Sequence, residues 1–318
     1  MEKKLYTDPL IETFLFESAG WKAKADQLSD LFLDDDCLRD RGIKMRECGH
    51  WLIFDRAGMD SAPPPAAAET APAYHFTRSN FCRQRLCPVC QWRRSRLIFA
   101  QLTDVWQNLK DQGYEVLHVV LTVRNVRGCH LRDEITRMYA AYSFMSHHPF
   151  LIGWKGSLRF LEVSYNMNDK TYHPHLHVLV AVKPSYFKSR YYVSVDLLTM
   201  LWRAALHINY DPVVHIKKCD PRGILEVSKY CVKPFDFSAV DPAETLGIYR
   251  CFDVVLHGRR LIQSYGVIRQ TIADCKLSDT LDDEPDREYT LDDLQAELGE
   301  AAHKVYVYNR DARRYELT

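Results

Sequence analysis

Two kinds of segment are missing from this 318-residue sequence. No stretch approaches about 18 uninterrupted apolar residues, which is what a membrane-spanning helix needs. The first residues, MEKKLYTDPLIETF, carry charges and lack the apolar core of a secretory signal. We therefore expect an intracellular, cytoplasmic protein without a membrane partner.

Net charge is missing as well, because 42 Lys and Arg balance 42 Asp and Glu. This average hides an asymmetry: residues 271–300 hold 11 acidic residues against Lys276 and Arg287, whereas residues 76–100 hold six arginines and no acid. A basic body with an acidic tail is common where phosphate is the partner. A solvated tail and an Arg-rich surface helix would give the same numbers, so charge alone decides nothing.

Three of the ten cysteines are clustered as Cys82-x4-Cys87-x2-Cys90. A reducing cytosol disfavours disulfides, so clustered cysteines there are more often metal ligands. Cys48 or His50 can complete a tetrahedral site, and a structural Zn²⁺ is the expected occupant. The alternatives are a redox pair in CPVC and unliganded buried thiols.

Basic and aromatic residues surround this cluster and suit phosphate contacts and base stacking. The alternative to DNA binding is a helix anchored by the zinc site whose arginines form ion pairs with the acidic tail. The candidate DNA-binding residues are Arg83, Arg85, Trp92, Arg93, Arg94 and Arg96.

The hydrophobic periodicity predicts an α+β fold. Strands are expected at 115–126, 158–166, 173–182 and 213–218, and helices at 97–112, 131–146, 195–207 and 224–233. From residue 115 the order is β-α-β-β-α-β followed by a helix, which is a ferredoxin-like split βαβ antiparallel sheet with backing helices. The predicted regions are a zinc-stapled N-terminal region at 1–112 with a Pro/Ala-rich loop at 57–73, a main domain at 113–270 and an acidic segment at 271–318.

Candidate metal ligands lie on the second and third of these strands. His175 and His177 share one strand face because side chains alternate. If the hairpin turns near residues 168 and 169, Glu162 lies across from His175 and faces the same side. Two imidazoles and a carboxylate leave open positions for water and a phosphate oxygen and suit Mg²⁺ or Mn²⁺. Alternatively the histidines line a polar face, and Glu162 pairs with Arg159 or a lysine.

A candidate nucleophile lies on the last predicted helix. Glu226, Tyr230 and Lys233 fall at i, i+4 and i+7 and share one face. A nearby cation and metal favour the phenolate form of a tyrosine, which is the nucleophilic form. Taken alone, Tyr230 is better explained as an ordinary surface tyrosine of an amphipathic helix, because the chain has 18 tyrosines.

The combination of a His-x-His strand with Tyr-x-x-Lys on a later helix resembles the HUH endonuclease superfamily, and within it the replication initiators of small rolling-circle plasmids. LTVRNV (121–126), SYN…YHPHLHVLV (164–180) and EVSKYCVK (226–233) resemble the three motifs of that family in order. FCRQRLCPVCQWRRS (81–95) resembles the Cys-rich segment that precedes them. Four ordered motifs are far more specific than one.

The resemblance implies a nicking domain in which His175 and His177 bind the divalent ion. Tyr230 would attack the scissile phosphate of origin DNA, leaving a 5′-phosphotyrosine and a free 3′-hydroxyl primer, and Lys233 would orient or neutralise the phosphate. Position 234 is proline, so one tyrosine occupies the motif and Glu226 would direct the final hydrolysis. Unwinding and synthesis would need a host helicase and replication machinery.

Other functions stay open at this point. A transposase or conjugative relaxase would share the superfamily, although relaxases usually carry a helicase or primase region and the sequence has no G-x4-G-K-[ST] loop. An inert zinc-binding DNA regulator and a metal-dependent hydrolase without a covalent step are two further classes. The origin sequence, the oligomeric state and the role of residues 271–300 are not given by the sequence.

Overall fold

The computed structural model describes residues 8–56, 74–228, 240–275, 277 and 303–318. The Pro/Ala-rich loop, Tyr230, Lys233 and most of the acidic segment lie outside the described residues. The chain forms two compact units, residues 1–92 with 285–318 and residues 93–284. The regions drawn from the sequence at 1–112, 113–270 and 271–318 stay a proposal.

The first unit begins with two packed helices, α1 (Asp8–Leu33) and α2 (Arg39–Glu47). Gly42 of α2 allows their close approach, because a Cβ at this position would lie 3.0 Å from the Cβ of Phe32. Lys22 of α1 is buried and its Nζ lies 2.7 Å from Asp26 Oδ1. Lys22 also donates to the backbone carbonyl of Arg46 in α2. This hydrogen bond joins the two helices, whereas the ion pair lies within α1.

A four-stranded antiparallel sheet completes the first unit, in the order β2-β1-β8-β9. Trp51 of β1 pairs with Val307 of β8, so the last strands of the chain extend a sheet begun near its start. Phe54, Tyr308 and Tyr315 are buried in the core of this unit. The strands are β1 (Trp51–Arg56), β2 (Tyr74–Ser79), β8 (His303–Asn309) and β9 (Arg314–Leu317).

α3 (Pro88–Asp111) continues from the first unit into the second. Pro88 occupies the first helical position, where a missing N–H costs nothing. The predicted apolar stripe is present, since Ile98, Leu102, Val105 and Leu109 are buried.

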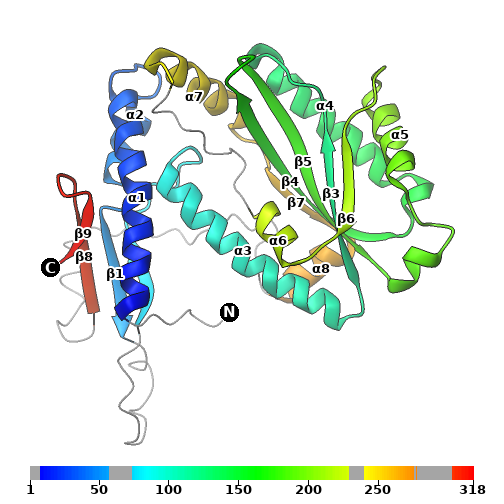
Figure 1. Ribbon diagram of the computed structural model, residues 1–318, viewed down its shortest axis with the longest axis horizontal. Coiled ribbons are helices and arrows are strands. Elements are labelled where there is room, and N and C mark those ends of the chain that lie inside the picture. The colour runs from blue at the N-terminus through cyan, green and yellow to red at the C-terminus, as the bar shows by residue number, and fades with distance from the viewer. Residues whose placement is uncertain (1–7, 57–73, 229–239, 276, 278–302) are drawn as a thin grey trace, which may run out of the picture. The chain divides into compact units, whose positions relative to one another are not determined.

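The second unit is built on a five-stranded antiparallel sheet with the order β6-β3-β5-β4-β7 (Figure 1). Its first four strands follow the chain order β3-α4-β4-β5-α5-β6, with β3 and β5 in the centre, which is the split βαβ arrangement. The predicted α+β fold class is therefore confirmed. The elements are β3 (Glu115–Thr122), α4 (Gly128–Ser146), β4 (Trp154–Asn166), β5 (Thr171–Val182), α5 (Val195–Leu206), β6 (Val214–Lys218) and β7 (Ile262–Tyr265).

Shorter elements connect and follow these strands. α6 follows β6 directly, and α7 and α8 flank β7. Their bounds are α6 (Pro221–Val227), α7 (Pro242–Leu256) and α8 (Gly266–Asp274), with single 3-10 turns at Pro149–Leu151 and Pro184–Lys188.

α4 covers one face of the central sheet. Tyr142 of α4 donates its hydroxyl hydrogen to Ser157 Oγ at 2.7 Å, and the guanidinium of Arg159 lies 3.6 Å from the ring centroid of Tyr139. Ser157 and Arg159 alternate along β4 with Glu162, which therefore points to the opposite face. The candidate metal ligands lie on the face that α4 does not cover.

The periodicity predicts a strand that ends at Val126, but β3 ends at Thr122. The backbone leaves the sheet because its next groups bond elsewhere: the Arg124 N–H donates to Tyr210 Oη at 3.1 Å. Val126 and Tyr172 then exchange two backbone hydrogen bonds of 2.8 Å each. The loop after β3 is thus held against the start of β5.

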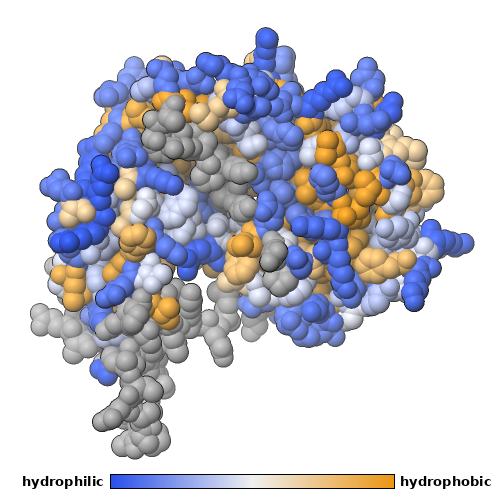
Figure 2. All heavy atoms as spheres, viewed as in Figure 1, coloured by the Kyte–Doolittle hydropathy of each residue, from blue (hydrophilic) through white to orange (hydrophobic). Residues whose placement is uncertain are grey.

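Figure 2 shows a mainly hydrophilic surface, with apolar residues gathered over α5 and β6. Exposed apolar side chains of this part of the chain include Met200 and Val213. Such side chains are common on folded proteins. Among the described helices, none combines the length and apolar character required to cross a membrane.

Candidate active site and cysteine cluster

Glu162, His175 and His177 meet on the face of the second unit's sheet opposite α4. Glu162 of β4 pairs in register with His175 of β5, as the predicted hairpin requires. Their ligand atoms lie within 4.8 Å of one another. Glu162 Oε2 is 3.0 Å from His177 Nε2 and 3.5 Å from His175 Nε2, and all three side chains are at most 14% exposed. The strand pairing thus produces one compact donor set.

Each histidine offers one nitrogen to this set. His175 Nδ1 lies 3.3 Å from the carbonyl oxygen of His173, which can only accept, so Nδ1 carries the proton and Nε2 keeps its lone pair. His177 Nε2 is buried and has no hydrogen-bond partner among the described residues. The donor set therefore fits a divalent ion.

Glu162 is ionised in this environment. Burial raises the pKa of its carboxyl group, but His175 and His177, whose imidazoles carry positive charge when protonated, lower it by more, so the pKa falls well below its usual range in the absence of an ion. A buried carboxylate next to two imidazole nitrogens is an effective cation ligand.

His118 of β3 lies beside this donor set and is absent from the residues predicted from the sequence. It is 3% exposed, and its Nε2 lies 3.0 Å from His177 Nδ1. Burial, then the charges of His177 and Lys217, lower the pKa of His118 to about 4, against a smaller opposing effect of Glu226 and Asp220. The available signal was a single histidine within the otherwise apolar run EVLHVVLTV.

Asn125 links the loop after β3 to the histidine strand. Its Oδ1 lies 2.8 Å from His173 Nδ1, and its Nδ2 donates to Thr171 Oγ1 at 3.0 Å. His173 shares the strand face of His175 and His177, but its Nδ1 is hydrogen-bonded to Asn125 and it does not belong to the three-residue donor set.

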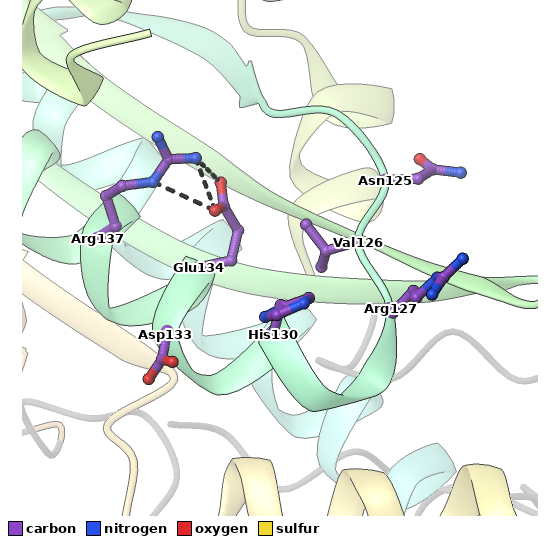
Figure 3. Close-up of a pocket in the computed structure, with 7 residues that line it drawn as sticks. All are labelled: Asn125, Val126, Arg127, His130, Asp133, Glu134 and Arg137. Carbon is purple, nitrogen blue, oxygen red and sulfur yellow. Dashed lines mark hydrogen bonds and ion pairs between the residues drawn. The ribbon is translucent and has the colours of Figure 1, made fainter.

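A pocket of about 470 Å³ lies beside this loop (Figure 3). Glu134 and Arg137 face each other within it, and Arg137 Nη2 donates a hydrogen bond to Glu134 Oε2 at 2.6 Å. Asn125 and Arg127 point away from that pair. Its lining residues are Asn125, Val126, Arg127, His130, Asp133, Glu134 and Arg137.

Of the predicted nucleophile motif, the structure describes only Glu226. It is half-buried on α6, whose N-terminus is capped by Asp220 Oδ1 accepting from the Gly223 N–H at 2.7 Å. The charge of Glu226 acts on the pKa of His118, which places α6 within electrostatic range of the histidine strands. Tyr230 and Lys233 follow α6 in the sequence, outside the described residues.

The cysteine cluster belongs to the first unit. The Sγ atoms of Cys48, Cys82, Cys87 and Cys90 lie within 4.8 Å of one another. Cys90 Sγ is 3.5 Å from Cys48 Sγ and 3.7 Å from Cys82 Sγ, near the about 3.8 Å expected when four sulfurs surround zinc at 2.3 Å. His50, the alternative fourth ligand, does not belong to this described group.

Four chain segments supply these thiols: the end of α2, the segment after β2, the residue before α3 and the first turn of α3. Hydrogen bonds from the other three thiols hold the pKa of Cys82 far below its usual range, whereas burial raises the pKa of Cys48 and Cys87. A thiolate surrounded by buried thiols matches the chemistry of a tetrahedral zinc site.

The candidate DNA-binding residues lie around α3. Trp92 is partly buried, and its ring centroid lies 5.2 Å from that of Phe14. Arg94 is buried, and Arg93 and Arg96 are half-exposed. Arg83, with φ of 56°, and Arg85 precede α3. Contact of these residues with DNA stays a prediction.

Comparison with known proteins identifies the family to which the chain is similar. The sequence profile of a family described as Replication protein matches residues 74–316. The chain is similar to a Protein rep of Lactiplantibacillus plantarum, 31% identical over 275 residues, which cover 80% of this chain and 83% of that protein. It is also similar to a Protein rep of Streptococcus pneumoniae, 30% identical over 310 residues, 93% of this chain and 90% of that protein. No solved structure matches the chain.

Proposed function

The chain belongs to the Replication protein family, and from this premise we propose that it initiates rolling-circle replication of a plasmid by nicking single-stranded origin DNA. The observation that carries the proposal is the donor set of Glu162, His175 and His177. Bound Mg²⁺ or Mn²⁺ would supply Lewis-acid polarisation of the scissile phosphate. This role needs a buried, preformed set of few ligands with open positions, and the set on β4 and β5 has that character.

Tyr230 is the proposed nucleophile. Its phenolate oxygen forms a bond to phosphorus, and the bond between phosphorus and the 3′ oxygen breaks, so the 5′ end stays on the protein and the 3′-hydroxyl primes synthesis. Lys233, three residues further along the sequence, neutralises phosphate charge. The short sequence distance between Tyr230 and α6, which lies near the histidine strands, supports this role.

Glu226 is the proposed general base of the closing step. After one round of synthesis, a water molecule or a new 3′-hydroxyl must attack the phosphotyrosine, and a carboxylate near that phosphate can accept the proton. The motif has one tyrosine and a proline at position 234, so no second tyrosine is adjacent for this step.

The cysteine cluster is the proposed site of a structural Zn²⁺. It joins the segments around β1 and β2 to the start of α3, and the sequence around it contains Arg83, Arg85, Arg93, Arg94 and Arg96. These arginines are proposed to contact DNA phosphates, with Trp92 between them. The chain has no nucleotide-binding G-x4-G-K-[ST] loop, so we propose that a host helicase unwinds the plasmid.

The function is tested by trapping the covalent intermediate. The full chain is incubated with Mn²⁺ and an oligonucleotide carrying the plasmid's nick region, and the product is digested and mapped by mass spectrometry. We expect a nucleotide mass on the peptide that contains Tyr230, only when metal is present.

Each competing function predicts a different product. Cleavage without any protein-bound nucleotide indicates a metal-dependent hydrolase, and tight binding without cleavage indicates a DNA-binding regulator. Transfer of the bound strand to a target other than the origin indicates a transposase. An adduct on a different tyrosine overturns the assignment of Tyr230.

Replacing Glu162 by glutamine tests the metal site separately. The substitution keeps the side-chain volume but removes the charged ligand, so Mn²⁺ affinity should fall by more than the about 10–100-fold that loss of an outer-shell partner costs. Calorimetric titration of the protein with Mn²⁺ measures this. Asp169→Asn, at the exposed turn of the same hairpin, is the matched control and should bind as the native protein does. Equal affinity in Glu162→Gln would show that this carboxylate is not a ligand.

A further inference from the structure

His118 is a buried histidine that the proposed chemistry leaves unused. It lies on β3 beside β5, where its register partner is Leu179 and the partner of His177 is Val120. The imidazole planes of His118 and His177 are 21° apart and their centroids are separated by 5.2 Å. With 3.0 Å between His118 Nε2 and His177 Nδ1, the two nearly coplanar rings share one N–H···N hydrogen bond.

A hydrogen bond between two neutral imidazoles has two arrangements, depending on which ring donates. If His118 Nε2–H donates, His177 carries its own proton on Nε2, which then has no lone pair for a metal. If His177 Nδ1–H donates, its Nε2 lone pair faces Glu162 and His175. Only the second arrangement binds an ion, and it places the proton of His118 on Nδ1.

The two candidate ligands differ in this respect. The Nδ1 partner of His175 is a backbone carbonyl, which permits one tautomer only. The Nδ1 partner of His177 is a side chain that can either donate or accept. Furthermore, His118 Nδ1 is buried without a hydrogen-bond partner among the described residues, so protonating that nitrogen costs free energy.

We propose that His118 is a positioning residue that sets the tautomer and ring orientation of His177, so that His177 Nε2 binds the divalent ion. The inference rests on the proposed metal site and deepens it. Ion binding selects the arrangement in which His177 Nδ1–H donates to His118 Nε2. His118 accordingly keeps His177 hydrogen-bonded both with and without the ion.

Two substitutions separate this role from simple packing. His118→Gln retains a side chain that presents either a carbonyl oxygen or an amide N–H to His177. His118→Phe fills the space but offers no partner, so the Nδ1–H of the metal-binding tautomer is left unsatisfied. His215→Phe, on the neighbouring strand β6 and exposed, is the matched control.

The test is Mn²⁺ binding by the full chain, followed through the electron paramagnetic resonance signal of the free ion. We expect His118→Phe to weaken Mn²⁺ binding about 10–100-fold, the usual effect of losing an outer-shell partner. His118→Gln should bind within about threefold of the native protein, and His215→Phe should not differ from it. In ¹⁵N spectra of the histidine rings, added Mg²⁺ should move the His177 proton from Nε2 to Nδ1.

Other results overturn the inference in distinguishable ways. Equal Mn²⁺ affinity in all variants leaves the metal site intact and removes the role of His118. Equal weakening in His118→Gln and His118→Phe, with the same loss of thermal stability, shows that His118 acts through packing. No Mn²⁺ binding by the native chain overturns the proposed metal site itself, and the inference with it.

Discussion

Tyr230→Phe is expected to abolish the covalent protein–DNA adduct and to lower the nicking rate at least about 10⁴-fold, as removal of a nucleophile does in other enzymes with a covalent intermediate. Phenylalanine keeps the ring but lacks the oxygen that forms the bond to phosphorus. Mn²⁺ binding should not change, because Glu162, His175 and His177 remain. A denaturing gel of a labelled oligonucleotide measures both the adduct and the cleaved strand.

Tyr192→Phe is the matched control for this result. Tyr192 belongs to the same unit and is 50% exposed, so the substitution removes a tyrosine hydroxyl without disturbing a core. It should form the adduct at the native rate. Unaltered cleavage by Tyr230→Phe would instead show that a metal-activated water attacks the phosphate directly, without a covalent step.

Loss of zinc is expected to unfold the first unit while the second keeps its structure. Structural zinc sites contribute apparent binding free energies of about 10–16 kcal/mol in zinc-finger peptides, comparable to or above the stability of a whole domain. Cys87→Ser should therefore purify with little zinc. Hydrogen exchange should lose protection in α1 and β1 but not in the β4–β5 hairpin. Metal analysis of the native chain should give one zinc per molecule.

Cys37→Ala provides the comparison, since Cys37 is an exposed cysteine of the same unit. It should retain zinc and native exchange rates. A native chain that contains no zinc and a disulfide between Cys87 and Cys90 would support the redox alternative. Native hydrogen-exchange protection in Cys87→Ser would show that the cysteine cluster does not contribute to the free energy of unfolding of the first unit.

The central sheet was accessible to sequence analysis because its signals are local. Runs of apolar and β-branched residues indicate the strands, and a hairpin with a short turn fixes its own register, so the sequence places Glu162 opposite His175. The cysteine cluster was predictable in part, because three of its members lie within one short segment.

Features that depend on contacts between distant segments were not accessible. No local pattern indicates that the last strands of the chain pair with β1, since Trp51 and Val307 share neither a turn nor a repeat. The meeting of His118 and His177 depends on the register between β3 and β5, which are separated by α4 and β4. The position of Tyr230 relative to the metal ligands also stays a prediction, because it lies outside the described residues.

The pairing of β1 with β8 has a consequence for biosynthesis. The second unit lies in the sequence between the two parts of the first, so a ribosome completes the second unit while one edge of β1 still lacks its partner. Chain segments that must wait for distant partners fold slowly and expose strand edges in the meantime. Zinc captured by the four cysteines, all of which emerge early, would hold the N-terminal part together until β8 and β9 arrive. Such an ion would stabilise the N-terminal segments during synthesis and would then remain bound in the folded first unit.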